Sequence, residues 1–192
     1  MNEEIKQKFC REFGSDRVLL EEPMKRHTTF RIGGPAEVFV MPGNLEEMQR
    51  ILEICRTEDL PYFILGNGSN LLVGDGGYRG AVIQIYRNMS SVTVEGNEIT
   101  AQAGALLSAV AAAAKNASLT GFEFAGGIPG TIGGAVVMNA GAYGGEMKDV
   151  LTEVTVMNAE GDIFTLPTEE LELGYRTSII KTAGYIVLEA KI

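Results

Sequence analysis

A short segment, Gly66-Asn67-Gly68-Ser69-Asn70, directly follows the apolar run Pro61–Leu65 and has the residue types of an anion site. Successive backbone N–H groups in a glycine-containing turn form a concavity that binds anions, and Ser and Asn side chains add hydrogen bonds. Glycine permits this because its backbone adopts positive φ or approaches a ligand closely. The segment therefore predicts a phosphate-binding turn; the alternative on local grounds is a tight turn between two strands.

A second glycine-rich stretch lies at residues 126–145, where eight of twenty residues are glycine. In the whole chain 24 of 192 residues are glycine, about one in eight, against a usual value of about 7%. So much backbone without side chains costs conformational entropy unless something lies against it. We therefore expect a flat or phosphorylated ligand along this stretch, in preference to a purely structural role.

A third candidate is Gly174-Tyr175-Arg176-Thr177-Ser178, where an arginine follows an aromatic residue ahead of a final strand. The planar guanidinium group binds a carboxylate or a phosphate through two parallel hydrogen bonds. From the local sequence alone, a surface salt bridge is the simpler explanation of Arg176.

Several common sites are excluded by inspection. The chain has no Gly-Lys pair and no Gly-x-Gly-x-x-Gly, so the Walker A loop and the Rossmann fingerprint are missing. His27 is the one histidine, which argues against a His-based zinc site or a Ser–His–Asp triad. We expect no metal site and interpret His27 as a structural, half-buried loop residue.

Composition limits the classes of partner and compartment. The formal net charge is −9 and the pI about 4.7, whereas a nucleic-acid surface needs clustered Lys and Arg, so no nucleic acid is expected. Cys10 and Cys55 form no CxxC pair, and isolated thiols fit a reducing compartment. The charged start MNEEIKQKFC does not resemble a signal peptide, and no run approaches the roughly 18 apolar residues of a membrane span. The prediction is a cytoplasmic protein without membrane insertion.

These candidate residues need elements to position them, and hydrophobic periodicity predicts which. Asn44 and Glu47 have the spacing of a capping box, and Thr168 is the expected cap of a short helix through Leu173. Helices are expected at 3–13, 45–55 and 106–116, and strands at 37–41, 61–65 (buried), 71–73, 81–86, 92–94, 99–102, 154–157, 163–166 and 185–192. Strands and hairpins with few helices indicate an α+β fold, not a doubly wound sheet.

Four motifs occur in order along the chain: Thr28-Thr29-Phe30-Arg31-Ile32-Gly33-Gly34-Pro35-Ala36, Gly66–Asn70, Gly127–Tyr143 and Tyr175–Ser178. Together they resemble the UDP-N-acetylenolpyruvoylglucosamine reductase family, and the resemblance covers nearly all of the chain from about His27. It implies the FAD-binding fold of vanillyl-alcohol oxidase (the PCMH type), in which two α+β lobes clasp an extended FAD. The implied organisation is an N-terminal helical arm (1–26), a first lobe (27–88) and a second lobe (89–192).

The resemblance also implies the site. Gly66–Asn70 and Gly130–Gly134 would hold the pyrophosphate, and Asn139–Tyr143 would run along the flavin. The implied cofactor-binding residues are Gly66, Asn67, Gly68, Ser69, Asn70, Gly127, Ile128, Pro129, Gly130, Thr131, Gly133, Gly134, Asn139, Ala140, Gly141, Ala142 and Tyr143. Arg176 would stabilise charge on a substrate carboxylate, with Tyr175 at the same site.

In this family NADPH reduces the flavin, which then reduces the enolpyruvyl group of a UDP-sugar in peptidoglycan precursor synthesis, and so serves cell-wall biogenesis, cell shape and cell division. Its members continue into a third, substrate-covering domain that supplies a serine proton donor, and a glutamate follows it. Neither has a counterpart within residues 1–192, so we expect a fragment, without the substrate domain, that is inactive alone. A monomer is expected.

Three alternatives stay open at this point. One is another oxidoreductase of the same fold, such as a hydroxy-acid oxidase. Another is a non-catalytic module that binds FAD or a nucleotide. The last is a glycine-rich structural protein, although the chain has no repeat to support it.

Overall fold

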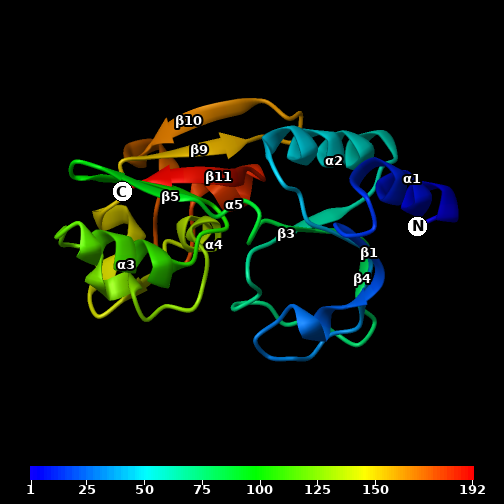
Figure 1. Ribbon diagram of the computed structural model, residues 1–192, viewed down its shortest axis with the longest axis horizontal. Helices are drawn as coiled ribbons and strands as arrows, with labels where there is room; N and C mark the ends of the chain where they lie inside the picture. Colours follow the sequence, from blue (N-terminus) through cyan, green and yellow to red (C-terminus); the bar gives the residue numbers. More distant parts are fainter. The chain divides into compact units, whose positions relative to one another are not determined.

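The computed structural model describes residues 1–192, and the chain forms two compact units, Met1–Asn88 and Met89–Ile192 (Figure 1). The first unit begins with the predicted polar helix, α1 (Glu3–Phe13). Asn2 caps this helix by accepting a hydrogen bond from the Ile5 N–H at 2.9 Å. Its buried residues, Phe9 and Phe13, anchor it to the unit.

The sheet of the first unit has four strands in the order β1-β2-β4-β3. They are β1 (Val18–Pro23), β2 (Pro35–Val40), β3 (Tyr62–Leu65) and β4 (Tyr78–Gln84). Strands β2, β4 and β3 run parallel, and β1 pairs antiparallel with β2. Residues 1–26, expected as a helical arm, thus also contain β1 and the 3₁₀ helix η1 (Met24–Arg26).

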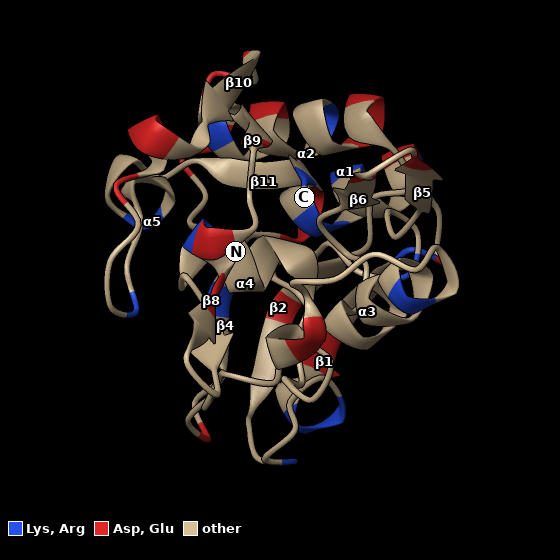
Figure 2. Cartoon of the chain, turned by 90° about the vertical axis from the view of Figure 1, so that its left-hand side faces the viewer, with Lys and Arg blue, Asp and Glu red and all other residues tan.

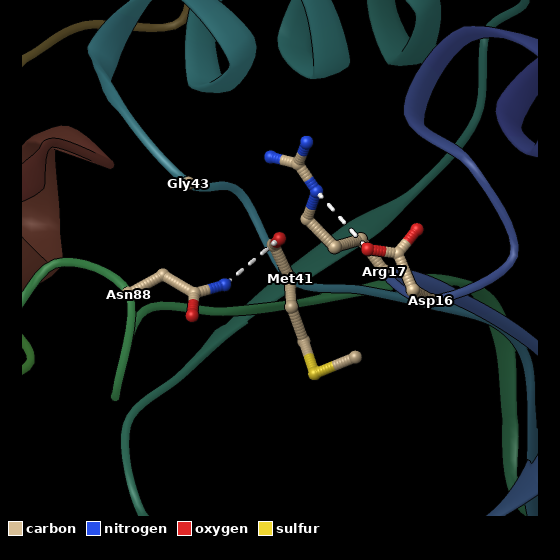
Figure 3. A pocket seen from close by; sticks show the side chains of 5 residues that line it. All are labelled: Asp16, Arg17, Met41, Gly43 and Asn88. Atoms are coloured by element: carbon tan, nitrogen blue, oxygen red, sulfur yellow. Dashed lines mark hydrogen bonds and ion pairs between the residues drawn. The ribbon is translucent and has the colours of Figure 1, made fainter.

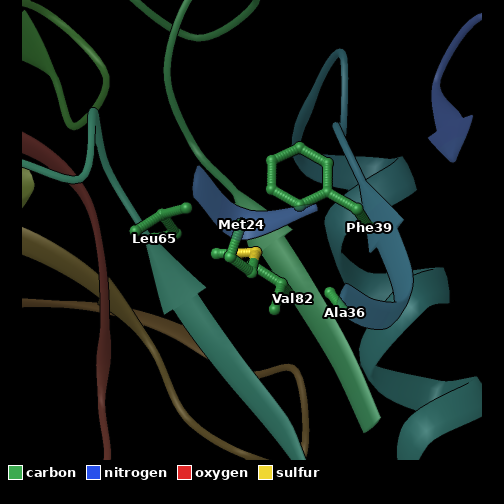
Figure 4. Packing of buried hydrophobic residues seen from close by; sticks show 5 residues of the cluster. All are labelled: Met24, Ala36, Phe39, Leu65 and Val82. Carbon is green, nitrogen blue, oxygen red and sulfur yellow. The ribbon is translucent and has the colours of Figure 1, made fainter. Parts of the chain in front are cut away.

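Part of the core of this unit is a cluster of five buried residues from η1 and three strands (Figure 4). Its members are Met24, Ala36, Phe39, Leu65 and Val82. Leu65 is the last residue of β3, so the segment that follows it starts from a fixed point in the core. The packing of this cluster therefore positions the first glycine-rich turn.

Helix α2 (Leu45–Thr57) has the predicted N-cap, because Asn44 accepts a hydrogen bond from the Glu47 N–H at 2.9 Å. The second half of the predicted capping box is wrong. The Glu47 carboxylate accepts from the N–H of Gly43 at 2.7 Å and pairs with the Arg17 guanidinium instead. The N–H of Gly43 and a nearby cation thus outcompete the N–H of Asn44 for this carboxylate. Apolar residues recurring at 3–4-residue spacing predict a buried stripe of Leu45, Met48, Ile51, Leu52 and Cys55; all are buried except Leu45, which is 39% exposed.

The second unit contains a five-stranded antiparallel sheet in the order β10-β9-β11-β6-β5. Its strands are β5 (Val92–Glu95), β6 (Glu98–Gln102), β9 (Glu153–Met157), β10 (Ile163–Pro167) and β11 (Ile186–Lys191). The strands expected at 92–94 and 99–102 are confirmed and pair as the hairpin β5–β6, and those expected at 154–157 and 163–166 pair as the hairpin β9–β10. The final strand is the central one and joins them.

Three helices and a small hairpin complete this unit. Helix α3 (Leu107–Asn116) packs on β5 and β6, while α4 (Ile132–Val137) packs on β11 and on α5 (Ile179–Ala183). The hairpin is β7 (Gly141–Ala142) with β8 (Gly145–Glu146). The remaining 3₁₀ helices are η2 (Glu123–Ala125), η3 (Met147–Asp149) and η4 (Thr168–Leu171).

Three local predictions are wrong. Leu71–Val73 is not a strand, although it is apolar, because it lies in a loop whose end is bonded to another loop: Gly34 donates to Gly74 O at 3.0 Å. The strand expected as buried at 61–65 is an edge strand, with Phe63 39% exposed. Thr168 caps no helix; its hydroxyl donates to the Leu151 carbonyl at 2.6 Å.

Charged residues are dispersed over the elements of both units, with Lys and Arg interspersed among Asp and Glu (Figure 2). Every helix is too short or too polar to span a bilayer. Ion pairs Arg50–Glu12 and Lys8–Glu58 connect α2 and the residue that ends it to α1.

Candidate functional site

The turn Gly66–Asn70 is held by the segment that carries the Thr-Thr-Phe motif. The N–H of Thr29 donates to the Gly68 carbonyl at 3.1 Å, and the Gln84 side-chain amide donates to the Gly66 carbonyl at 3.0 Å. Gly68 has φ +71, and a Cβ there would lie 1.8 Å from the His27 carbonyl oxygen. Only glycine fits this position, so the turn has a single backbone course.

The hydrogen bonds that hold this turn leave its own hydrogen-bond donors without protein partners. The N–H groups of residues 66–70 donate to no protein acceptor, and the side chains of Asn67, Ser69 and Asn70 have no hydrogen-bond partner in the structure. Both anchoring bonds are accepted by carbonyl oxygens. The turn therefore has the unsatisfied donors that an anion site requires.

A hollow of about 540 Å³ in the first unit includes Asn67 of this turn. Three arginines line it, in a chain whose net charge is −9. Its lining residues are Arg26, His27, Thr28, Thr29, Arg31, Met41, Asn67, Gln84, Tyr86 and Arg87. Sequence reasoning missed this arginine group, because Arg87 lies more than 50 residues beyond Arg26 and Arg31 and only the fold brings the three together.

His27 has the structural role that was expected. Its ring stacks on Phe39 with 4.0 Å between ring centroids, and its Nε2 lies 3.0 Å from the Glu22 carboxylate. Glu22 also pairs with Arg26 at 3.4 Å. These contacts explain why the backbone of His27 is firmly placed against Gly68.

A second hollow of the first unit, of about 560 Å³, contains none of the predicted site residues (Figure 3). Asp16, Arg17, Met41, Gly43 and Asn88 line it. Its cation, Arg17, is already paired with Glu47, and Asp16 lies 4.0 Å from the same guanidinium. The hollow therefore offers no free charge for a ligand.

In the second unit, the segment Gly130–Gly134 enters α4. The N–H of Ile132 donates to Ala105 O and that of Gly133 to Ala103 O, both at 2.8 Å. The N–H groups of Gly130, Thr131 and Gly134 have no protein acceptor. The predicted phosphate donors are thus divided: two N–H groups fix the loop against its neighbour, and three are available to a ligand.

The glycines of this stretch are of two kinds, those that close packing requires and those that it does not. A Cβ at Gly133 would lie 3.0 Å from Ala103 Cβ, and one at Gly141 would lie 2.7 Å from Gly145 O, so packing explains both glycines. Gly127 has nothing within 4 Å, and Gly134 only an ordinary contact at 3.8 Å with Thr131. Packing does not require glycine at these last two positions, which fits a ligand lying close to the backbone.

The predicted flavin segment Asn139–Tyr143 ends at the tip of the β7–β8 hairpin. Tyr143 has φ +53 and is 98% exposed at this tip, beside Gly144 with φ +89. Asn139, in contrast, is 3% exposed, and protein atoms occupy its side-chain amide.

Tyr175 and Arg176 form the tip of a tight turn, because Gly174 and Thr177 exchange backbone hydrogen bonds of 3.1 and 3.3 Å. Tyr175 is 90% exposed, and the Arg176 guanidinium lies 5.6 Å from its ring centroid. Arg176 has φ +56 and forms no ion pair. The surface salt bridge, the simpler local explanation of Arg176, is therefore not formed.

The residues present fit FAD in each unit considered by itself. Free backbone donors occur in both glycine-rich segments, and an unpaired guanidinium lies beside an exposed aromatic ring. The structure brings no three His, Cys, Asp or Glu side chains together as a metal site. Both cysteines are free, and burial raises the pKa of Cys55 to about 12, so its thiol is inert near neutral pH.

Comparisons with known proteins agree with this chemistry. The profile of a family described as an FAD binding domain matches residues 36–167. The chain is 55% identical over 187 residues to the UDP-N-acetylenolpyruvoylglucosamine reductase of Alkaliphilus metalliredigens and 48% identical over 191 residues to that of Clostridioides difficile. These alignments cover 97% and 100% of this chain but 62% and 63% of the relatives, so the chain spans less than two thirds of their length.

Solved structures show the fold. The crystal structure of UDP-N-acetylenolpyruvylglucosamine reductase from Thermus caldophilus matches with a TM-score of 0.76 at 38% identity, over 90% of this chain and 59% of that one. p-Cresol methylhydroxylase matches with a TM-score of 0.72 at 18% identity, over 98% and 42%. The predicted α+β fold of the vanillyl-alcohol oxidase (PCMH) kind is confirmed.

Proposed function

The chain belongs to the FAD binding domain family, and on this basis we propose that it is the FAD-binding part of an NADPH-dependent UDP-N-acetylenolpyruvoylglucosamine reductase. The substrate is UDP-N-acetyl-3-O-(1-carboxyvinyl)-glucosamine and the product UDP-N-acetylmuramate, a peptidoglycan precursor. The relatives that match nearly the whole chain support this proposal through their names. The observation that carries it is the set of N–H groups in two glycine-rich segments that have no acceptor within the protein.

The chain's own residues have two tasks, binding the cofactor and stabilising charge. In the first unit the free N–H groups of Gly66–Asn70, and in the second unit those of Gly130, Thr131 and Gly134, are each suited to donate to phosphate oxygens of FAD. Backbone donors suit this chain, since no lysine-bearing phosphate loop occurs in it. The backbone of Asn139–Tyr143 provides the surface along which the flavin lies.

FAD, when bound, supplies the redox chemistry between NADPH and the enolpyruvyl group, while the protein supplies position and electrostatics. Arg176 binds the substrate carboxylate and stabilises the negative charge that grows there as the double bond is reduced. It is suited to this because its guanidinium has no carboxylate partner of its own. Tyr175 holds the guanidinium by stacking at 5.6 Å.

The test begins with purified protein and its visible spectrum. We expect bands of bound flavin, and their release on unfolding as free FAD shows non-covalent binding. In the full-length FAD-loaded reductase that contains residues 1–192 we expect oxidation of NADPH that depends on the enolpyruvyl UDP-sugar. Flavin binding without such oxidation would leave only the FAD-binding part of the proposal, and absence of flavin binding would overturn all of it.

The remaining expectations belong to the same proposal. Residues 1–192 by themselves should bind FAD without turnover, because the resemblance places the proton donor and the glutamate outside this range. We also propose a cytoplasmic location and a monomeric state. Sedimentation and cell fractionation test them.

A further inference from the structure

The side chain of Asn139 connects three segments of the second unit. Its Nδ2 donates to the Glu146 carboxylate at 2.5 Å and to the Gly174 carbonyl at 3.2 Å, and its Oδ1 accepts from the Lys148 N–H at 3.0 Å. Asn139 is 3% exposed, so water does not compete for these bonds. Both hydrogens of the Asn139 amide and its oxygen are hydrogen-bonded to protein, so the side chain has no free donor for a ligand.

Two of these three bonds, those to Glu146 and Gly174, connect Asn139 to segments that carry residues of the proposed site. Glu146 is in β8, one strand of the hairpin whose tip is Tyr143. Gly174 is the first residue of the turn whose tip is Tyr175 and Arg176. Asn139 therefore connects the hairpin of Tyr143 to the turn of Arg176, although Asn139 and Gly174 are 35 residues apart in the chain.

A second anchor holds the other end of the same turn. The hydroxyl of Ser178, which is 2% exposed, donates to the Val137 carbonyl at 2.9 Å. Val137 is the last residue of α4, and Asn139 follows it by two positions. Arg176, which has no bond of its own to the protein beyond the Tyr175 ring, is thus held by two bonds to the end of α4.

The backbone conformation of residue 139 shows that asparagine is present for its side-chain hydrogen bonds. Its φ is +41, in the left-handed region that follows the last turn of a helix. Glycine is the usual residue there, and asparagine is the side chain that tolerates it best. Since glycine suits this backbone better, the presence of asparagine is explained by the side-chain bonds and not by the helix end.

We propose that Asn139 is a positioning residue: its side chain sets the location of Arg176 through Gly174 and of Tyr143 through Glu146, without contacting the cofactor. This rests on the proposed function, because it is the substrate carboxylate that Arg176 must meet. A guanidinium misplaced by about 1 Å can cost on the order of 10²-fold in rate. Loss of the Asn139 side chain should therefore affect enolpyruvyl reduction far more than cofactor binding.

The experiment uses Asn139→Gly in the full-length FAD-loaded reductase that contains residues 1–192, since glycine keeps the left-handed backbone and removes all three bonds. The matched control is Glu172→Gly, which replaces another left-handed residue (φ +48) whose exposed side chain has no partner. One readout is hydrogen exchange of residues 146–149 and 174–178. The other is the pair of half-reactions, flavin reduction by NADPH and flavin reoxidation by the enolpyruvyl UDP-sugar.

In Asn139→Gly we expect exchange at Lys148 and Thr177 to rise by about tenfold or more. We expect reoxidation to slow by about tenfold or more, while flavin reduction and FAD affinity stay at the control's values. Asn139→Asp should do the same, because a carboxylate would face the Glu146 carboxylate and the Gly174 carbonyl. If the glycine variant does not fold, Glu146→Gln carries the test and should show the same split to a smaller degree.

Faster hydrogen exchange without slower flavin reoxidation would overturn the positioning role of Asn139. An equal fall in the rates of both half-reactions would overturn it too. A fall in FAD affinity that matches the fall in rate would make Asn139 a cofactor-binding residue instead. Failure of the proposed function has a different signature, because the unaltered protein would then not reduce the enolpyruvyl substrate at all. That result would overturn the inference together with the function.

Discussion

The N–H of Thr29 donates to the carbonyl of Gly68 across 39 residues of sequence, with an N···O distance of 3.1 Å. This bond joins the motif Thr28–Ala36 to the glycine-rich turn Gly66–Asn70. It leaves the N–H groups of Gly66–Asn70 without protein acceptors, because only a carbonyl of the turn is used. The geometry of the turn thus depends on the segment beside it as much as on its own residues.

Gly68→Ala should abolish FAD binding and destabilise the first unit. A methyl group at this position would lie 1.8 Å from the His27 carbonyl oxygen, at φ +71. The left-handed backbone alone costs roughly 1–2 kcal/mol for a residue other than glycine. The cause of the loss is therefore displacement of the turn, and not a side chain in the phosphate space. Flavin fluorescence titration and thermal unfolding measure the two effects.

Gly76→Ala is the matched control, since a Cβ at Gly76 would meet nothing within 4 Å. It should bind FAD as the unaltered protein does. Equal FAD affinity in Gly68→Ala and Gly76→Ala would exclude the turn as a phosphate site.

Gly134→Ala should raise the thermal stability of the protein and lower its affinity for FAD. Gly134 lies in α4, is exposed and has only an ordinary contact at 3.8 Å, so alanine fits. In a helix this exchange stabilises by about 1 kcal/mol, and we expect Tm to rise by a few degrees. We expect FAD affinity to fall by about tenfold, because the methyl group would cover the approach to free N–H groups.

Gly133→Ala gives the contrasting result. Its Cβ would lie 3.0 Å from Ala103 Cβ and 3.2 Å from Ala103 O, so the loop must shift and Tm should fall. A Gly134→Ala protein with higher Tm and unchanged FAD affinity would show that the cofactor does not approach α4.

The parts of the fold that the sequence predicts are those with a local signal. The strands of the hairpins β5–β6 and β9–β10 follow from local sequence patterns, and α2 follows from its capping residue and hydrophobic periodicity. Helix α4 has no such signal, since Ile132–Val137 contains two glycines, which disfavour helix. It forms because β11 and α5 cover it, a tertiary effect.

The candidate site likewise contains residues that a local sequence signal reveals and residues that it does not. Gly66–Asn70 is recognisable because its chemistry lies in five consecutive residues. The role of Asn139 is not, because its partners Glu146 and Gly174 lie 7 and 35 residues away. The sequence places Asn139 with the cofactor residues, whereas its side chain is bonded to protein.

Cys55 should resist alkylation until the protein unfolds. Burial raises the pKa of this thiol from 9.0 to about 12, and the thiolate is the reactive form. In a Cys10→Ser variant at pH 8.5, iodoacetamide should react about a thousandfold more slowly with folded than with urea-unfolded protein. Similar rates in both states would contradict the buried position of Cys55.

The same shift has a consequence for stability at high pH. Between about pH 9 and about 12 the unfolded chain has lost the Cys55 proton while the native protein keeps it. The unfolded state then binds fewer protons, so the free energy of unfolding falls as pH rises through this window. Urea denaturation at pH 8 and pH 11 should show a smaller decrease in Cys55→Ala, which has no thiol to ionise.

Arg176→Lys should slow enolpyruvyl reduction by on the order of 10²-fold, because lysine keeps the charge but loses the planar two-point fork. The turn itself should survive, since its bonds are between the Gly174 and Thr177 backbones. Flavin reduction by NADPH should suffer less, because that half-reaction builds no charge on the sugar carboxylate. Stopped-flow measurement of each half-reaction checks this, with Arg11→Lys, an exposed arginine of α1, as control. If both half-reactions slow equally, or only FAD affinity changes, Arg176 supports structure or cofactor and not the substrate carboxylate.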